Sequence, residues 1–226
     1  MATYVLRVWL PDRPGALGAV ASRVGAVGGD VVGIDILERG GGRAIDELVI
    51  DLPEPGLVSL LLEEVRCVDG VDIEEIRPVA AGLRDPDLSA LATAEQLVSE
   101  ESARGLVEAL VQLVGRQFDA GWGVVLDLGT GETVAVSGRP PPVPWLVAFV
   151  EGSQASLHAF GAQPGASDVA WAPLPDTDAA VVLGREGRPF HERERRQLEL
   201  LTRIADHRLG ETTISLRSRL LHPSAS

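Results

Sequence analysis

The sequence predicts an α+β protein built from two domains, and three observations lead to this expectation. The chain has 226 residues, of which 45% are apolar, so at about 150 residues per domain it can hold one or two cores. Strand-like alternation and helix-like spacing of apolar residues follow one another along most of its length. A short polar stretch with a proline separates two such series. We expect domains at 1–80 and 89–210, a linker at 81–88 and a C-terminal tail at 211–226.

The first eighty residues carry the pattern of a strand, a helix, two strands, a helix and a strand. Residues 3–10 alternate as a strand does, and the residues from Pro11 to Gly15 end that strand. Proline suits the first turn of a helix and a nearby aspartate can cap that turn, so a helix should follow. The expected elements are a strand at 3–10, a helix at 17–27, strands at 30–38 and 44–52 around a glycine-rich turn, a helix at 58–65 and a strand at 71–79.

This order is the split βαβ arrangement, in which two helices cover one face of an antiparallel sheet. The segment Asp12-Arg13-Pro14-Gly15-Ala16-Leu17, between the first strand and the first helix, resembles the ACT domain, a small regulatory module attached to many enzymes of amino-acid metabolism. The resemblance covers residues 3–79 and includes Gly-Gly-Asp-Val-Val at 28–32. It implies a ferredoxin-like fold and a homodimer, in which an amino acid binds between the first loop of one copy and the second strand of another.

The junction at Gly15 offers a physical basis for such binding. The free N–H groups of a helix's first turn favour an anion, and glycine lets a ligand approach the main chain. An α-carboxylate would lie there, Arg13 would add a charge-assisted contact, and Asp12 or Asp30 would receive the ammonium group. Asp30 departs from the family, which often has asparagine at this position. The candidate ligand-binding residues are Asp12, Arg13, Pro14, Gly15, Ala16, Leu17, Asp30, Val31 and Val32.

A simpler interpretation remains open for the same residues. Asp12 would cap the helix, Arg13 would be solvated, and the domain would serve only to dimerise. No small molecule would then bind.

Residues 89–210 predict a second mixed domain. A helical pattern runs from Leu88 to about Phe118, in one or two segments, and glycines at 129 and 131 indicate a hairpin. A stiff proline-rich loop at 140–144 precedes an apolar stretch at 145–150. The expected strands are 122–128, 132–137, 167–172 and 179–184, and a final helix runs from about Glu192 to Leu209.

This second series resembles a GAF domain, a sensor-like module, over residues 89–209. The best match is the strand end at 181–185, the Gly-Arg-Pro-Phe turn at 187–190 and the charged helix start at 192–196. The segment lacks a chromophore cysteine and an Asn-Lys-x-Asp-Glu signature, so we expect no bound nucleotide. A cavity in this domain would be filled by the chain's own Trp122, Trp145, Phe149 and Trp171, or, as the alternative, would hold a small ligand that the sequence does not identify.

The composition argues against several functions. The net charge is −13 and lysine is absent, so nucleic acid is a poor partner, and mechanisms that need a lysine are excluded. The four histidines have no partner at metal-ligand spacing, and each is expected at the surface or at a cap. The one cysteine, Cys67, is expected on the apolar side of the second helix.

The sequence therefore predicts a non-catalytic regulatory protein of the cytoplasm, with no metal, no cofactor and no membrane or nucleic-acid partner. Its expected partners are a small amino-acid effector, a second copy of the chain, and a separate protein or metabolic enzyme that receives the signal. The alternative is a ligand-free dimerisation protein.

Overall fold

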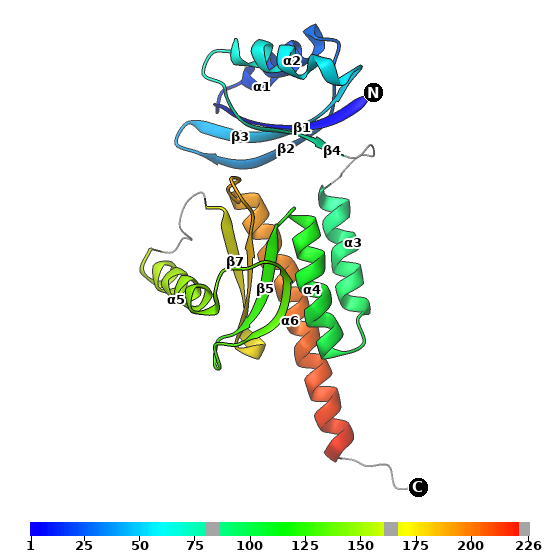
Figure 1. Cartoon of the computed structure of the whole chain (residues 1–226), viewed down its shortest axis with the longest axis vertical. Coiled ribbons are helices and arrows are strands. Elements are labelled where there is room, and N and C mark those ends of the chain that lie inside the picture. Colours follow the sequence, from blue (N-terminus) through cyan, green and yellow to red (C-terminus); the bar gives the residue numbers. More distant parts are fainter. Residues whose placement is uncertain (80–85, 161–166, 222–226) are drawn as a thin grey trace. The chain divides into compact units, whose positions relative to one another are not determined.

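Two four-stranded antiparallel sheets organise the chain, one in each of two units (Figure 1). The computed structural model describes residues 1–79, 86–160 and 167–221, and the units are Met1–Asp85 and Pro86–Ser226. The predicted α+β class is confirmed. None of the helices within these ranges combines the length and the apolar composition that a bilayer crossing needs.

The first unit contains the six predicted elements in the predicted order. Its strands lie in the order β2-β3-β1-β4 with all neighbours antiparallel, so β2 and β4 are the edges of the sheet. The elements are β1 (Ala2–Pro11), α1 (Ala16–Ala26), β2 (Asp30–Gly40), β3 (Arg43–Leu52), a 3-10 turn η1 (Pro55–Leu57), α2 (Val58–Arg66) and β4 (Asp72–Val79).

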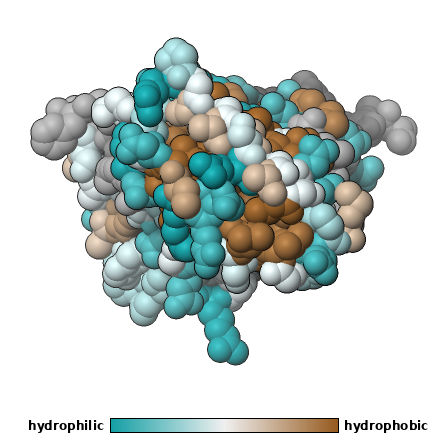
Figure 2. All heavy atoms as spheres, turned by 90° about the horizontal axis from the view of Figure 1, so that it is seen from above, coloured by the Kyte–Doolittle hydropathy of each residue, from teal (hydrophilic) through white to brown (hydrophobic). Residues whose placement is uncertain are grey.

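Both helices of the first unit lie on the same face of its sheet (Figure 1). Every second residue of β1 and β3 points to this face and packs against the apolar side of α1 or α2. Figure 2 views the molecule from the side of α1 and α2, where hydrophilic residues surround separate apolar patches. The residues buried in the core between this sheet and the two helices include Leu6, Val8, Leu10, Val20, Val24, Leu48, Ile50, Leu52, Leu61 and Val65.

The second unit has helices on both faces of its sheet, whose strand order is β6-β5-β8-β7. Helices α4 and α6 cover one face and α5 covers the other, while α3 packs against α4 and α6. The elements are α3 (Pro86–Ser99), α4 (Ala103–Gln117), β5 (Trp122–Asp127), β6 (Thr133–Gly138), α5 (Val143–Phe160), β7 (Val169–Leu174), a 3-10 turn η2 (Pro175–Thr177), β8 (Ala179–Gly184) and α6 (Glu192–Leu221).

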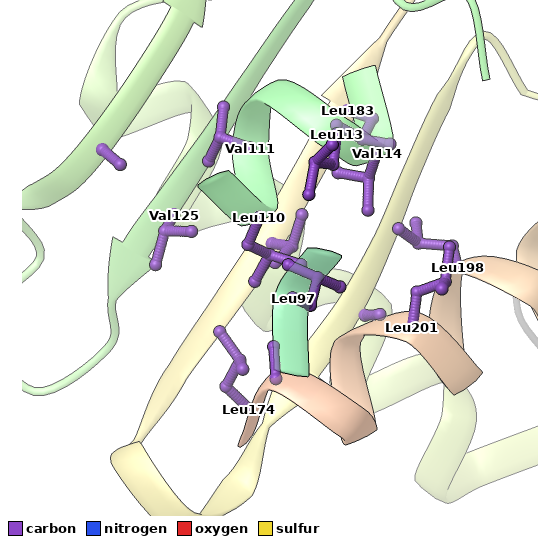
Figure 3. Packing of buried hydrophobic residues seen from close by; sticks show 14 of the residues in the cluster. Leu97, Leu110, Val111, Leu113, Val114, Val125, Leu174, Leu183, Leu198 and Leu201 are labelled. Atoms are coloured by element: carbon purple, nitrogen blue, oxygen red, sulfur yellow. The ribbon is translucent and has the colours of Figure 1, made fainter. Parts of the chain in front are cut away.

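The larger core of this unit lies between the sheet and α3, α4 and α6 (Figure 3). Leu97 of α3 and Leu110 of α4 lie side by side, between Val125 and Leu174 of the sheet and Leu201 of α6. The expected helical region from 88 to 118 is thus two helices. The break comes at Ser102, whose hydroxyl oxygen accepts a hydrogen bond from the Gly105 N–H at 3.0 Å and caps α4.

Three boundaries in the second unit differ from those expected. Helix α3 begins at Pro86, inside the stretch assigned to the linker, because proline fits a first helical turn; residues 80–85 lie outside the described residues. For the same reason α5 begins within the proline-rich stretch and contains the apolar residues 145–150. Helix α6 continues to Leu221, through much of the segment expected as a tail. No proline interrupts the chain between Glu192 and Pro223.

Candidate functional site

The turn between β1 and α1 is fixed to the hairpin that joins β2 and β3. Pro11 pairs with Arg43, and the Asp12 N–H donates to the Gly42 carbonyl oxygen at 2.9 Å. Gly15 then takes a left-handed conformation, with φ 87° and ψ −13°, and turns the chain into α1. Only glycine adopts this conformation without steric cost, so the sequence dictates where the helix begins.

The first turn of α1 is open. No side chain caps it, so the expectation that Asp12 caps this helix is wrong. The Ala16 N–H donates to the Arg13 carbonyl oxygen, whereas the N–H groups of Leu17 and Gly18 find no acceptor within the described residues. A Cβ atom built on Gly15 would meet no atom within 4 Å. The main chain is therefore accessible where its partial positive charge is concentrated.

The side chains of this turn point to the surface. Asp12 and Pro14 are exposed, and the Arg13 side chain is 63% exposed, with its nearest carboxylate, Asp69, at 4.0 Å. Ala16 is buried in the core and Leu17 packs against it. Arg13 is thus available to a ligand, while Ala16 and Leu17 contribute main-chain groups.

The other predicted half of the site lies at the opposite end of the same sheet. Asp30 pairs with Asp51 at the far end of β3, whereas Pro11 pairs with Arg43 at its beginning. The eight steps from Arg43 to Asp51 correspond to about 27 Å at 3.4 Å per residue. A single copy of the chain therefore does not bring the turn and the residues at 30–32 together.

Residues 30–32 combine a surface acid with a distorted strand. Asp30 is exposed and stands opposite Asp51, whose Oδ1 accepts a hydrogen bond from the Thr3 hydroxyl at 2.6 Å. Val31 packs against the core, and the register of β2 shifts at Val32. This end of β2 presents its polar groups and its irregular backbone at the edge of the sheet.

A residue that the sequence analysis missed, Asp46, lies on the helix-covered face of this sheet. It stands opposite Val8 on β1 and Ile36 on β2, and it is 3% exposed. Its Oδ1 is buried with no hydrogen-bond partner among the described residues. Burial raises the pKa of the Asp46 carboxyl, the Arg39 charge lowers it and the Asp12 charge raises it.

A sequence signal for Asp46 exists in the alternation of β3. The inward series runs Ala44, Asp46, Leu48, Ile50 and Leu52, and Asp46 is its one charged member. A charge at a position that alternation assigns to the core requires an explanation.

In the second unit, the segment from β8 to α6 that resembles a GAF domain makes its polar contacts with groups of the same unit. Arg185, at the end of β8, is 5% exposed, and its guanidinium lies 4.0 Å from the centre of the Phe190 ring. Both of its terminal nitrogens donate to the Glu194 carboxylate of α6, at 2.9 and 2.8 Å. Its other acceptors are the carbonyl oxygens of Phe118 at 2.9 Å, Arg188 at 3.1 Å and Pro189 at 2.6 Å.

The aromatic residues fill the face covered by α5 only in part. Trp171 is 3% exposed in a cluster with Val124, Leu146 and Val182, and Trp122 and Phe149 pack against it. Trp145 is 45% exposed and stacks on Phe149 at 5.4 Å between ring centres, so the expectation that it fills a cavity is wrong.

The expectation about Cys67 is also wrong. Cys67 is exposed because it lies one helical turn after the exposed Glu63, and not in line with the buried Leu61 and Val65.

His191 lies at a cap, one of the two places expected for the histidines: it precedes α6, its N–H donates to the Glu194 Oε2 at 2.9 Å, and its carbonyl oxygen accepts from the Arg195 N–H at 3.0 Å. His191 is fully buried, and the His207 side chain is 70% exposed. The side chain of His158 and all of His222 lie outside the described residues. Among the described residues, no three metal-binding side chains lie close enough to share an ion.

No protein-family model matches this chain, and no curated protein matches it. Among solved structures, the GAF domain of an Acinetobacter phosphoenolpyruvate-protein phosphotransferase is 14% identical and covers 58% of this chain and 97% of its own, with a TM-score of 0.42. A GAF domain assigned to a sensor histidine kinase of Pseudomonas syringae pv. tomato is 16% identical, with coverages of 61% and 92% and a TM-score of 0.36. A formyltetrahydrofolate deformylase from Pseudomonas putida KT2440 is 17% identical, with coverages of 42% and 38% and a TM-score of 0.27. Structures similar to this chain thus include two GAF domains.

Proposed function

We propose that this chain is a non-catalytic regulatory protein whose first unit is an ACT-like, ferredoxin-like module that binds a small amino acid between two copies. Its second unit is a GAF-like module that passes the binding event to a separate protein or metabolic enzyme. The observation that carries the proposal is the open first turn of α1 behind Gly15, where two N–H groups have no acceptor among the described residues.

The chemistry of that turn favours a carboxylate. The N–H groups of Leu17 and Gly18 and the dipole of α1 attract negative charge, and the exposed Arg13 side chain can add a charge-assisted hydrogen bond. A small ligand suits the turn because Gly15 leaves the approach to the main chain clear.

A second copy is needed because the two predicted halves of the site lie at opposite ends of one sheet. Strand β2 is an edge strand, and it exposes Ile34 by 47% and Ile36 by 36%. Antiparallel pairing of two β2 strands would place the beginning of each beside the end of the other. Since the end of β2 joins the hairpin that holds Asp12, this pairing would bring residues 30–32 of one copy toward the turn of the other.

The hydrogen bonds of Arg185 support a role for the second unit in relaying the signal. Arg185 holds the end of β8, the end of α4 and the start of α6 in one hydrogen-bonded group. For a signal to pass, the ligand must favour one arrangement of the dimer over another, and a rigid second unit then carries the difference to its partner.

A ligand-free dimerisation protein is the second candidate function. The exposed Ile34 and Ile36 on the edge strand favour it, because their burial by a second copy needs no small molecule.

A thermal-shift screen of the twenty common amino acids on the full chain separates the two functions. Under the regulatory proposal at least one amino acid raises the melting temperature, and the rise grows with its concentration. At one hundred times its dissociation constant, the ligand adds about 2.7 kcal/mol to the free energy of unfolding. A dimer that responds to none of the twenty would leave the dimerisation function in place and remove the regulatory one.

A further inference from the structure

Asp46 is a buried carboxylate next to the open turn. The connection from β1 through α1 to β2 passes over β3, because β3 lies between β1 and β2 in the sheet and such crossovers are right-handed. Asp46 lies on this covered face of β3, two residues from Ala44, which shares the core with Ala16 at the start of α1. The carboxylate is therefore on the face of β3 that α1 crosses, and it is near enough to Asp12 of the turn for the two charges to interact.

Asp46 has no ion pair within the described residues, and the Arg39 charge offsets the effect of its burial only in part. Its partner on β1 is Val8, and α1 has no charged residue before Arg23. Arg39 on β2 and Asp12 in the turn act on it with opposite signs, and the described residues offer its Oδ1 no hydrogen bond. A buried carboxyl oxygen without a hydrogen bond is costly, and a bound ligand, ion or water is one explanation for such a group in a native protein.

The geometry points to Asp46 as the receptor of a ligand ammonium group, an inference that rests on the amino-acid site proposed above. A zwitterion would place its carboxylate on the N–H groups of Leu17 and Gly18 and its ammonium group toward Asp46. Both ends then gain what the site lacks, an anion for the helix terminus and a cation for the buried acid.

This assignment sets the ligand class. A simple carboxylic acid would bring a negative charge toward Asp12 and Asp46 without compensating either of them. A 2-hydroxy acid has the shape of the corresponding amino acid but no positive charge. The site should therefore select α-amino acids over their 2-hydroxy analogues by charge, not by size.

The test uses the full chain, the variants Asp46→Asn and Asp69→Asn, and thermal shift followed by calorimetry. The probes are the twenty common amino acids and, as partners without an ammonium group, glycolate and lactate for glycine and alanine and the corresponding 2-hydroxy acid for any other amino acid that binds. We expect an amino acid to bind the wild type and Asp69→Asn alike, Asp46→Asn at least tenfold more weakly, and the 2-hydroxy analogue not to compete. Asp69 is the matched control because it is a fully exposed acid near the same turn.

The outcomes separate the two levels of the proposal. Equal affinity of the wild type and Asp46→Asn, or equal competition by the 2-hydroxy acid, would overturn the role of Asp46 and leave the amino-acid site standing. A wild type that binds none of the twenty amino acids would overturn both. The competition experiment needs only the wild type, so it decides the role of Asp46 even if Asp46→Asn does not fold.

Discussion

The two units each contain a strand-to-helix junction with an arginine, a proline and a left-handed glycine, and the two junctions are completed in opposite ways. Between β8 and α6, Arg185 is buried and makes five hydrogen bonds, and Gly187 has φ 69°. Between β1 and α1, Arg13 is exposed, no side chain caps the helix, and Gly15 faces open space. The same residue types thus build a closed structural joint in one place and an accessible helix terminus in the other.

The two junctions differ in whether the folded chain supplies the partners of their polar groups. A buried charge whose hydrogen-bond partners all lie within the chain needs no ligand to account for it. A helix terminus without a side-chain cap leaves its N–H groups to water or to a ligand, and the buried Oδ1 of Asp46 has no hydrogen-bond partner among the described residues. Substitutions at the two junctions should therefore affect different properties.

The largest effect is expected for Arg185→Met. Removing the guanidinium takes away two hydrogen bonds to the Glu194 carboxylate, which keeps the one from the His191 N–H, and the donor of three carbonyl oxygens. This loss should lower the free energy of unfolding by about 3 to 5 kcal/mol. Urea denaturation of both variants measures this. The control, Arg196→Met, removes an arginine whose side chain is 64% exposed and should cost less than about 1 kcal/mol. Similar losses for the two variants would contradict the description of the second junction as a structural joint.

An intermediate effect, on ligand response rather than on stability, is expected for Gly15→Asn. Asparagine tolerates the left-handed conformation better than other side chains, so the variant should fold, while its side chain occupies the approach to the main chain. The thermal shift caused by the amino acid should then disappear, a loss of about 2.7 kcal/mol at one hundred times the dissociation constant.

Gly187→Asn is the matched control for this experiment. Gly187 is also left-handed and also has no atom within 4 Å of a built Cβ, but it belongs to the closed junction. Its substitution should carry the same conformational cost and leave the amino-acid response unchanged. If both variants keep the full response, the ligand does not bind at Gly15.

Much of this arrangement could be predicted from the sequence, because it follows from local rules. Alternation and helical spacing predicted the six elements of the first unit, and the Pro-Gly turn predicted where α1 begins. Helix α5 was missed because Pro142 and Pro144 indicate a loop, although proline is also compatible with a first helical turn. Cys67 was misplaced because it does not continue the apolar series of α2: it lies in line with the exposed Glu63, one turn earlier.

The candidate site could be predicted only in part, since its halves meet only if two chains pair. The motif located the turn at Gly15, but the position of Asp30 about 27 Å away along the sheet depends on strand register, which single-sequence patterns do not determine. Asp46 could have been found as the one charge in an inward series, but its lack of a partner is a property of the packed structure.

The smallest effect is expected for Asp46→Asn in the absence of ligand, and it tests whether the buried acid near the first junction has a partner within the fold. Burial raises the pKa of Asp46 in the folded state above the unfolded value of about 3.9, so the folded protein binds this proton more tightly than the unfolded chain does. The stabilisation that protonation provides is complete below the unfolded pKa and is lost as the pH rises through the folded pKa. At neutral pH, Asp46→Asn should therefore be more stable than the wild type by about 1 kcal/mol.

This gain should shrink as the pH falls toward 4, because the wild-type carboxyl then becomes neutral as well. Urea denaturation of both proteins between pH 4 and pH 7 measures the difference, with Asp69→Asn as the exposed-acid control. A substitution that stabilises the fold and yet weakens the amino-acid response would show that Asp46 is kept at a cost to folding, as functional residues often are. An Asp46→Asn protein that is less stable than the wild type at pH 7 would mean that the carboxylate has a partner inside the fold, which would make the first junction as self-sufficient as the second.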